Sequence, residues 1–167
     1  MFGGLGEHAF RLGKAARDAL KIQLDVEKLF IERRSAAELV ELLPDFALIA
    51  ILDGPAQEQG AMILSQAIVA GFIEAQTIGR VRGQDLPPRK PTRTDGAMVA
   101  GVIDAALATL EQALTENADI VWAGGFRCVS FLEDPRPLPV VLDDAPLRVL
   151  TADVSLSGGL RKGKIYL

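Results

Sequence analysis

Hydrophobic and polar positions follow two different periods in the first part of the chain. Over residues 7–20 the apolar side chains fall largely on one helical face and the charged ones on the other, which predicts an amphipathic helix. Over residues 22–27 apolar and polar residues alternate one by one, the pattern of a half-buried strand. Ser35 is a suitable N-cap for a short helix that ends at Leu43, before Pro44.

The next segment combines continuous apolar runs with a second helical pattern. Residues 46–52 are all apolar, which predicts a strand covered on both faces. A further apolar run over residues 61–64 is expected to pair with it as a hairpin across residues 57–60. Ser65 then stands at the start of a helical pattern that stops near Gly79, a residue type that commonly ends helices.

Between Gly79 and Thr94 the sequence carries three prolines, so we expect an exposed linker or an ordered loop. Beyond it, apolar residues recur every three or four positions from Val99 to Leu114. This spacing predicts a helix of about twenty residues with one broad buried stripe. Thr94 and Asp95 precede the pattern and are predicted to cap the helix, because a hydroxyl and a carboxylate satisfy its free amides and complement its dipole.

After Asn117 the chain changes to short apolar or alternating runs separated by turn residues, which predict strands. The runs cover residues 127–132, 138–142, 147–156 and 164–167. Because strands outnumber crossover helices here, we expect an α+β domain in which helices are layered on a mixed, largely antiparallel sheet. The order of elements also indicates two related, pseudo-twofold halves.

Composition narrows the chemistry that is available. The 167 residues are enough for one domain with a full core, and 49% are hydrophobic but only 5% aromatic, which indicates an aliphatic interior. A single His and a single Cys exclude a His/Cys zinc cage, a disulfide framework and a Cys-X-X-Cys redox pair. His8 and Cys128 are interpreted as ordinary structural residues. We therefore expect no catalytic, cofactor or metal site and no enzymatic activity.

Charge is unevenly distributed along the chain. The net charge is −4, but five basic residues against Asp85 alone give residues 79–94 a charge of +4 and leave the rest at −8. Such a segment is either a solvated connection or a contact surface for an acidic partner. The acidic remainder argues against nucleic acid as the partner. The predicted partner-binding residues are Gly79, Arg80, Arg82, Arg89, Lys90 and Arg93.

No run approaches the roughly 18 apolar residues of a membrane span. The first residues also lack the basic region and apolar core of a secretory signal. We therefore expect a cytoplasmic protein without membrane insertion.

Two stretches resemble a known family, the middle domain of flagellar motor switch protein FliM. In that family a strand leads into a helix that ends in a Gly-Gly-X-Gly loop, and a Phe-Thr-X-Thr-Glu motif opens a long helix. Residues 61–80 (AMILSQAIVAGFIEAQTIGR) match the first part, and Thr92, Thr94 and Asp95 stand at the Thr, Thr and Glu positions of the second. Residues 147–167 resemble the last two strands, so the resemblance covers roughly residues 44 to 167.

The resemblance implies one FliM-middle-domain-like domain over residues 1–167, a structural component of the flagellar motor switch or C-ring. It would pack against copies of itself through its first and long helices, and would contact FliG-like and FliN-like rotor proteins at the cytoplasmic face of the basal body. The ring-forming domain that the family shares with FliN is expected to be absent, because the chain stops at Leu167. Cytoplasmic-ring proteins of type III secretion share the general plan and are the alternative.

Besides the missing ring-forming domain, two departures limit what the resemblance implies. Ile78, Gly79, Arg80 and Val81 replace the Gly-Gly-X-Gly loop that contacts FliG, so only Gly79 is retained. The family's acidic-apolar peptide, which binds the response regulator, is absent before Glu7. CheC-type phosphatases share the plan and use a Glu-X-X-Asn motif, but no Glu in this chain is followed by Asn three residues later, which disfavours phosphatase activity.

Overall fold

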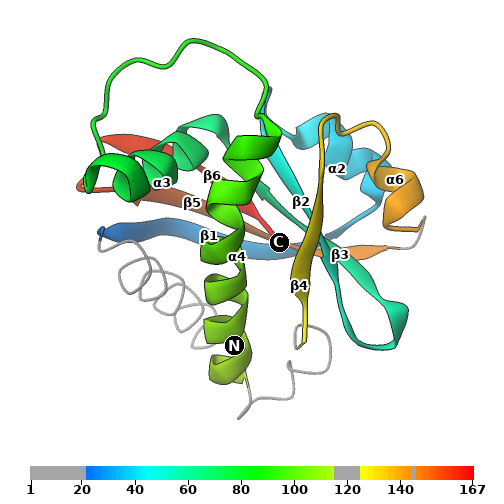
Figure 1. The fold of residues 1–167 in the computed structure, drawn as a ribbon. Helices are drawn as coiled ribbons and strands as arrows, with labels where there is room; N and C mark the ends of the chain where they lie inside the picture. The colour runs from blue at the N-terminus through cyan, green and yellow to red at the C-terminus, as the bar shows by residue number, and fades with distance from the viewer. Residues whose placement is uncertain (1–21, 115–124, 144–145) are drawn as a thin grey trace.

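A computed structural model describes residues 22–114, 125–143 and 146–167. The helix expected over residues 7–20, with His8, lies outside these ranges. A six-stranded sheet with the order β1-β5-β6-β3-β2-β4 forms the centre of the molecule, and all five strand pairings are antiparallel (Figure 1). The strands are β1 (Leu24–Arg34), β2 (Leu48–Asp53), β3 (Gln59–Leu64), β4 (Arg127–Leu132), β5 (Leu147–Leu156) and β6 (Arg161–Tyr166).

Helices cover both faces of the sheet, as the predicted layered α+β architecture requires. The described helices are α2 (Ala36–Leu42), α3 (Gln66–Ile78), α4 (Arg93–Leu114) and α6 (Leu138–Val141), with a short 3-10 turn η1 (Pro55–Gln57). Two separate hydrophobic cores result, one between the sheet and α3 and α4, the other between the sheet and α2 and α6. Strand β2 supplies Ala50 and Leu52 to the first core and Ile49 and Ile51 to the second, which explains its continuous apolar run.

Capping and turn residues in the sequence predicted the ends of several helices and strands. Ser35 caps α2 through a capping box, in which its hydroxyl accepts from the Glu38 amide and the Glu38 carboxylate accepts from the Ser35 amide. The predicted β2–β3 hairpin forms, but its connection covers residues 54–58 instead of 57–60, because Gln59 and Gly60 pair with Asp53 and Leu52. Helix α3 ends at Gly79 in the left-handed conformation, with φ 76°. Ser65 stands at the N-cap position of α3, but its hydroxyl accepts from the Lys164 amide at 2.9 Å and so ties α3 to β6.

The strand predicted over residues 138–142 is wrong, because these residues form the helix α6. The Val141 and Leu142 amides donate to the carbonyls of Pro137 and Leu138, at 3.1 and 3.0 Å. A five-residue apolar run fits a buried helical turn as well as a strand, and Pro137 suits the start of a helix because its missing N–H is not needed there. Leu138 is fully buried in the second core.

The strand order confirms the two related halves. Exchanging β1 with β4, β2 with β5 and β3 with β6 converts the order β1-β5-β6-β3-β2-β4 into its own reverse. Each edge strand carries one extra residue at the related place, Glu27 in β1 and Val129 in β4, where the pairing register shifts. Ile63 pairs with Tyr166 at the centre, where the pseudo-twofold axis crosses the sheet.

Candidate functional site

The loop that carries the basic residues joins α3 to α4 and lies outside the sheet. Figure 1 shows it arching from the end of α3 to the start of α4. We call residues 79–92 the basic loop. Most of its residues are exposed, but Val81 is buried in the core under α3 and α4, and Leu86 and Pro91 are half-buried. The loop therefore contacts the body of the domain along its length.

A buried arginine from the far end of the chain fixes the first part of the basic loop. The Arg161 guanidinium donates to the Glu74 carboxylate in α3 and to the carbonyl of Gln84 in the loop, both at 2.5 Å. The other Glu74 oxygen accepts from the Arg82 amide, also at 2.5 Å. The Arg161 side chain is only 7% exposed, so these contacts form away from solvent. Strand β6, helix α3 and the loop are joined at this point.

The second part of the loop is fixed to α3 and α4. The Gln66 side-chain amide donates to the carbonyl of Pro87 at 2.9 Å, and Arg89 forms an ion pair with Asp95 at 2.8 Å. Because Glu74 contacts the loop near Arg82 and Gln66 contacts it at Pro87, the loop runs back along α3 over a rise of about 12 Å. The basic loop is therefore an ordered loop held against the domain and not a free linker.

The cap of α4 differs from the prediction by two residues. The hydroxyl of Thr92 accepts from the Asp95 amide at 3.1 Å, and the Asp95 carboxylate accepts from the Thr92 amide at 2.8 Å. Asp95 caps the helix as predicted, but its partner is Thr92, and Thr94 lies exposed in the first turn. A capping box needs the acidic residue three positions after the hydroxyl, and only Thr92 has that spacing.

Asp95 remains charged despite its burial. Burial disfavours the charged carboxylate and is the largest single influence, but hydrogen bonds from Arg89 and from the Thr92 amide outweigh it, so the pKa of Asp95 is lowered. The Arg89 pKa is raised by the same contact. Arg89 was predicted to bind a partner, yet here its guanidinium holds the end of the loop on Asp95.

The remaining predicted residues lie on the outer surface. Gly79, Arg80, Arg82, Lys90 and Arg93 are all exposed. Arg93 approaches Glu133 at 3.7 Å, but both side chains are more than three-quarters exposed, so this contact contributes little. Within the described ranges, Arg80, Arg82 and Lys90 form no ion pair. The structure thus presents three exposed cations on one loop, and the charge of Lys90 also helps to lower the pKa of Asp134.

Sequence reasoning missed Arg161 and Glu74, the pair that fixes the loop. They lie 87 positions apart, and neither belongs to a local motif. It also missed two exposed apolar side chains near the N-terminal end of the basic loop. These are Ile78, which is 44% exposed, and Leu160, which is 52% exposed. No periodicity in the sequence marks either of these features.

The other candidates offer little chemistry. Burial raises the pKa of the half-buried Cys128 thiol, with a further contribution from Asp104, so the thiol is neutral and unreactive at physiological pH. Among the residues that the structure describes, no three His, Cys, Asp or Glu side chains cluster as metal ligands would. No helix in the described part is long and apolar enough to cross a membrane.

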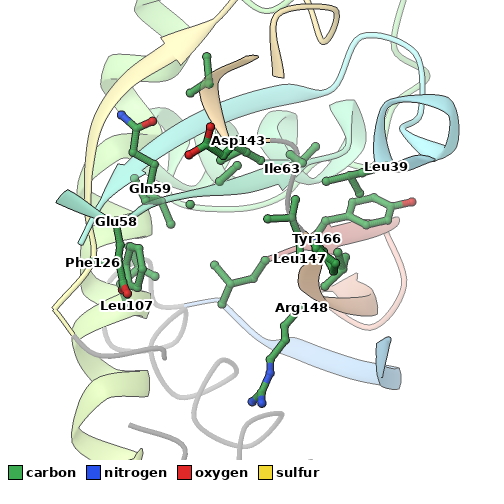
Figure 2. Close-up of a pocket in the computed structure, with 18 of the residues that line it drawn as sticks. Leu39, Glu58, Gln59, Ile63, Leu107, Phe126, Asp143, Leu147, Arg148 and Tyr166 are labelled. Carbon is green, nitrogen blue, oxygen red and sulfur yellow. The ribbon is translucent and has the colours of Figure 1, made fainter. Parts of the chain in front are cut away.

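A cavity of about 600 Å³ opens where β6 ends, between β3 and β5. It forms because β3 pairs with β6 only at Ile63 and Leu64, so residues 59–62 of β3 pair with no described strand on that side. Leu39, Phe126 and Tyr166 are among its lining side chains, and in Figure 2 the Arg148 guanidinium points away from them. The lining also includes the polar side chains of Gln57, Glu58, Gln59 and Asp143.

Comparison with solved structures identifies the fold. A chain of the FliG–FliM complex from H. pylori superposes with a TM-score of 0.73 at 10% identity, covering 95% of this chain and 84% of that one. The FliM middle domain from Vibrio alginolyticus gives 0.69 at 11% identity, covering 97% and 89%. FliY from Thermotoga maritima gives 0.68 at 15% identity, covering 97% and 85%.

The chain has the FliM middle-domain fold. No protein-family model and no curated protein sequence matches it. In the order of elements of the FliM middle-domain fold, the basic loop occupies the connection between α3 and the long helix α4. In the family that the sequence resembles, a Gly-Gly-X-Gly loop is expected at this connection. In this chain the connection is the basic loop.

Proposed function

We propose that this chain is a non-enzymatic structural domain of a flagellar motor switch, and that its basic loop contacts a rotor partner. The observation that carries the proposal is the ordered basic loop on a FliM middle-domain fold. A crystal structure of a FliG–FliM complex exists for a protein of the same fold, which supports a rotor protein as the partner. A single-domain organisation over residues 1–167 is part of the same proposal.

The physical properties of the loop suit recognition. A loop that is already held by side chains loses little conformational entropy when a partner binds, which favours affinity. The rest of the chain is acidic, so positive charge concentrated on one loop orients an approaching acidic surface. An ordered loop that presents exposed cations is therefore suited to bind an acidic partner surface.

The long helix supplies a second proposed contact. On its outward side α4 exposes Ala97, Gly101 and Ala108, small residues that allow another chain to approach closely. We propose that this face packs against a neighbouring copy in a ring, and that FliN-like proteins complete the assembly at the cytoplasmic face of the basal body. The type III secretion alternative is separated from this proposal by the genes that surround this one.

The loop is tested with the variant Arg80→Ala/Arg82→Ala/Lys90→Ala and a FliG-like protein from the same genome. Each exposed charge pair contributes about 0.5 kcal/mol, so losing three should weaken binding about tenfold. Isothermal titration calorimetry measures the dissociation constant. The variant should retain the melting temperature of the wild type, because none of the three side chains makes an ion pair within the described residues.

A control variant removes the same charge elsewhere. Lys28, Arg33 and Arg127 are exposed and lie in the edge strands β1 and β4, whereas the side chains that hold the basic loop come from β6, α3 and α4. Their replacement by alanine should leave binding within about twofold of the wild type. Equal loss of binding in both variants would show that only net charge matters. Unchanged binding in the loop variant would refute the loop as the contact.

A further inference from the structure

Arg161 is the only side chain in the described structure that bridges strand β6 and the basic loop by hydrogen bonds. It donates to Glu74 and to the Gln84 carbonyl, and Glu74 in turn accepts from the Arg82 amide. The three groups therefore fix the backbone of residues 82–84 from two directions. Removing the guanidinium would free the Gln84 carbonyl and leave Glu74 without its cation.

The turn before Arg161 also lies against residues 82–84 of the basic loop. Gly83 has a φ of 73° and lies so close to Leu160 that an added Cβ would be 3.1 Å from the Leu160 Cβ. Leu160 nevertheless remains half exposed, and Ile78, one helical turn beyond Glu74, is also exposed. Two apolar side chains thus lie at the same end of the basic loop as Arg80 and Arg82.

This combination defines the chemistry of the partner. Exposed apolar side chains next to cations fit a segment that presents both acidic and apolar side chains. Nucleic acid would meet only a few cations on a chain whose remaining charge is −8, and an anionic membrane would meet the same repulsion. An acidic protein segment is the partner class that the surface favours.

We infer that this end of the basic loop binds an acidic, apolar-containing segment of a partner protein, and that Arg161 is the positioning residue that holds the loop in its binding shape. The inference rests on the proposed function, because it assumes that the loop is a contact surface. It goes further by naming the class of partner segment and a residue outside the loop on which binding depends.

The probe for the test is a fluorescein-labelled helical peptide with glutamates on one face and leucines beside them, measured by fluorescence anisotropy. A second peptide with lysine in place of each glutamate is the charge control. The full chain should bind the acidic peptide, more weakly as salt rises, and should not bind the lysine peptide. Failure of the acidic peptide to bind, or tighter binding of duplex DNA or phosphatidylserine vesicles, would overturn the partner class.

The positioning role is tested with Arg161→Met, which leaves every exposed cation in place. Affinity for the acidic peptide should fall about tenfold, and the Arg82 amide, which donates to Glu74, should exchange hydrogen at least tenfold faster. The double variant Arg161→Met/Glu74→Gln removes both buried charges and should fold even if the single variant does not. It should show the same loss of affinity and the same faster exchange.

The outcomes separate this inference from the proposed function. Unchanged affinity and exchange in both Arg161 variants would overturn the positioning role while leaving the loop as a contact. If Arg80→Ala/Arg82→Ala also binds the peptide normally, the loop itself is not the surface. Arg127→Ala, at the start of β4, removes one exposed charge and should change neither measurement.

Discussion

The capping box of α4 leads to the most detailed prediction. Asp95→Asn keeps the size of the side chain and one oxygen to accept from the Thr92 amide, but removes the negative charge that faces Arg89. The carboxylate accepts three hydrogen bonds, from the Thr92 amide at 2.8 Å and from Arg89 at 2.8 and 3.3 Å. Asp95 is buried, with a side chain only 11% exposed, so these bonds are shielded on one side.

The loss of folding free energy expected for Asp95→Asn has two parts. The weakened cap and lost dipole interaction contribute about 1 kcal/mol. Arg89 is 55% exposed, so solvent screens its ion pair and we assign about 0.5 kcal/mol to it. The sum of about 1.5 kcal/mol corresponds to a melting temperature about 3–6 °C lower for a chain of this size. A double-mutant cycle with Arg89→Ala should recover a coupling of about 0.5 kcal/mol.

The pH dependence follows from the lowered pKa of Asp95. A carboxylate whose pKa is lower in the folded chain than in the unfolded chain stabilises the fold above its unfolded pKa of about 3.9. That stability is lost as the pH falls through the folded pKa. The difference in melting temperature between wild type and Asp95→Asn should therefore be full at pH 7 and should shrink below about pH 4.

Thermal unfolding followed by circular dichroism at pH 7, 5 and 3 measures the effect. Thr92→Val should cost about 1 kcal/mol because it removes the hydroxyl that accepts from the Asp95 amide, whereas Thr94→Val should cost less than about 0.5 kcal/mol. A difference between wild type and Asp95→Asn that stays constant from pH 7 to pH 3 would refute the electrostatic part. Equal costs at Thr92 and Thr94 would refute the assignment of the cap.

Two further predictions concern packing. Gly163→Ala would place a Cβ 2.0 Å from the Ser65 hydroxyl and should lower the free energy of unfolding by about 2–3 kcal/mol in urea titrations; Gly60→Ala, at the related position of the other half with its nearest contact at 3.4 Å, should cost less than about 1 kcal/mol. Equal costs would contradict the packing argument. Leu138→Ala should cost about 2–5 kcal/mol in the same titration, whereas the 85% exposed Val140→Ala should change it by less than about 0.5 kcal/mol; a stable Leu138 variant would contradict its place in the second core.

Patterns in the sequence predicted those elements whose cause is local. Strand β2 was predictable because a strand buried on both faces has apolar residues at every position. The start of α2 was predictable because Ser35 satisfies a helix amide three residues away. Even the α4 cap carried its signal, since the spacing from Thr92 to Asp95 is that of a capping box and the spacing from Thr94 is not.

Other features depend on contacts between distant residues. The α6 helix was missed because a run of five apolar residues does not distinguish a helical turn from a strand, and its assignment depends on Leu138 reaching the second core. The fixation of the basic loop was missed because Arg161 lies 87 and 77 positions from Glu74 and Gln84, and no local pattern links residues so far apart. A list of charged residues identified the loop but not the residue that shapes it.

The pseudo-twofold symmetry shows why that residue is informative. Counting back five positions from Ile63 and from Tyr166, the pair on the axis, gives Glu58 and Arg161 as related residues. Glu58 is exposed and acidic, whereas Arg161 is buried and basic. The contacts of Arg161 with Glu74 and Gln84 therefore have no counterpart at Glu58, and the loop that they fix is the connection between the two halves. The shape of the basic loop consequently depends on side chains from both halves, Glu74 in α3 and Arg161 in β6. A partner that binds the loop would therefore contact a surface that both halves shape.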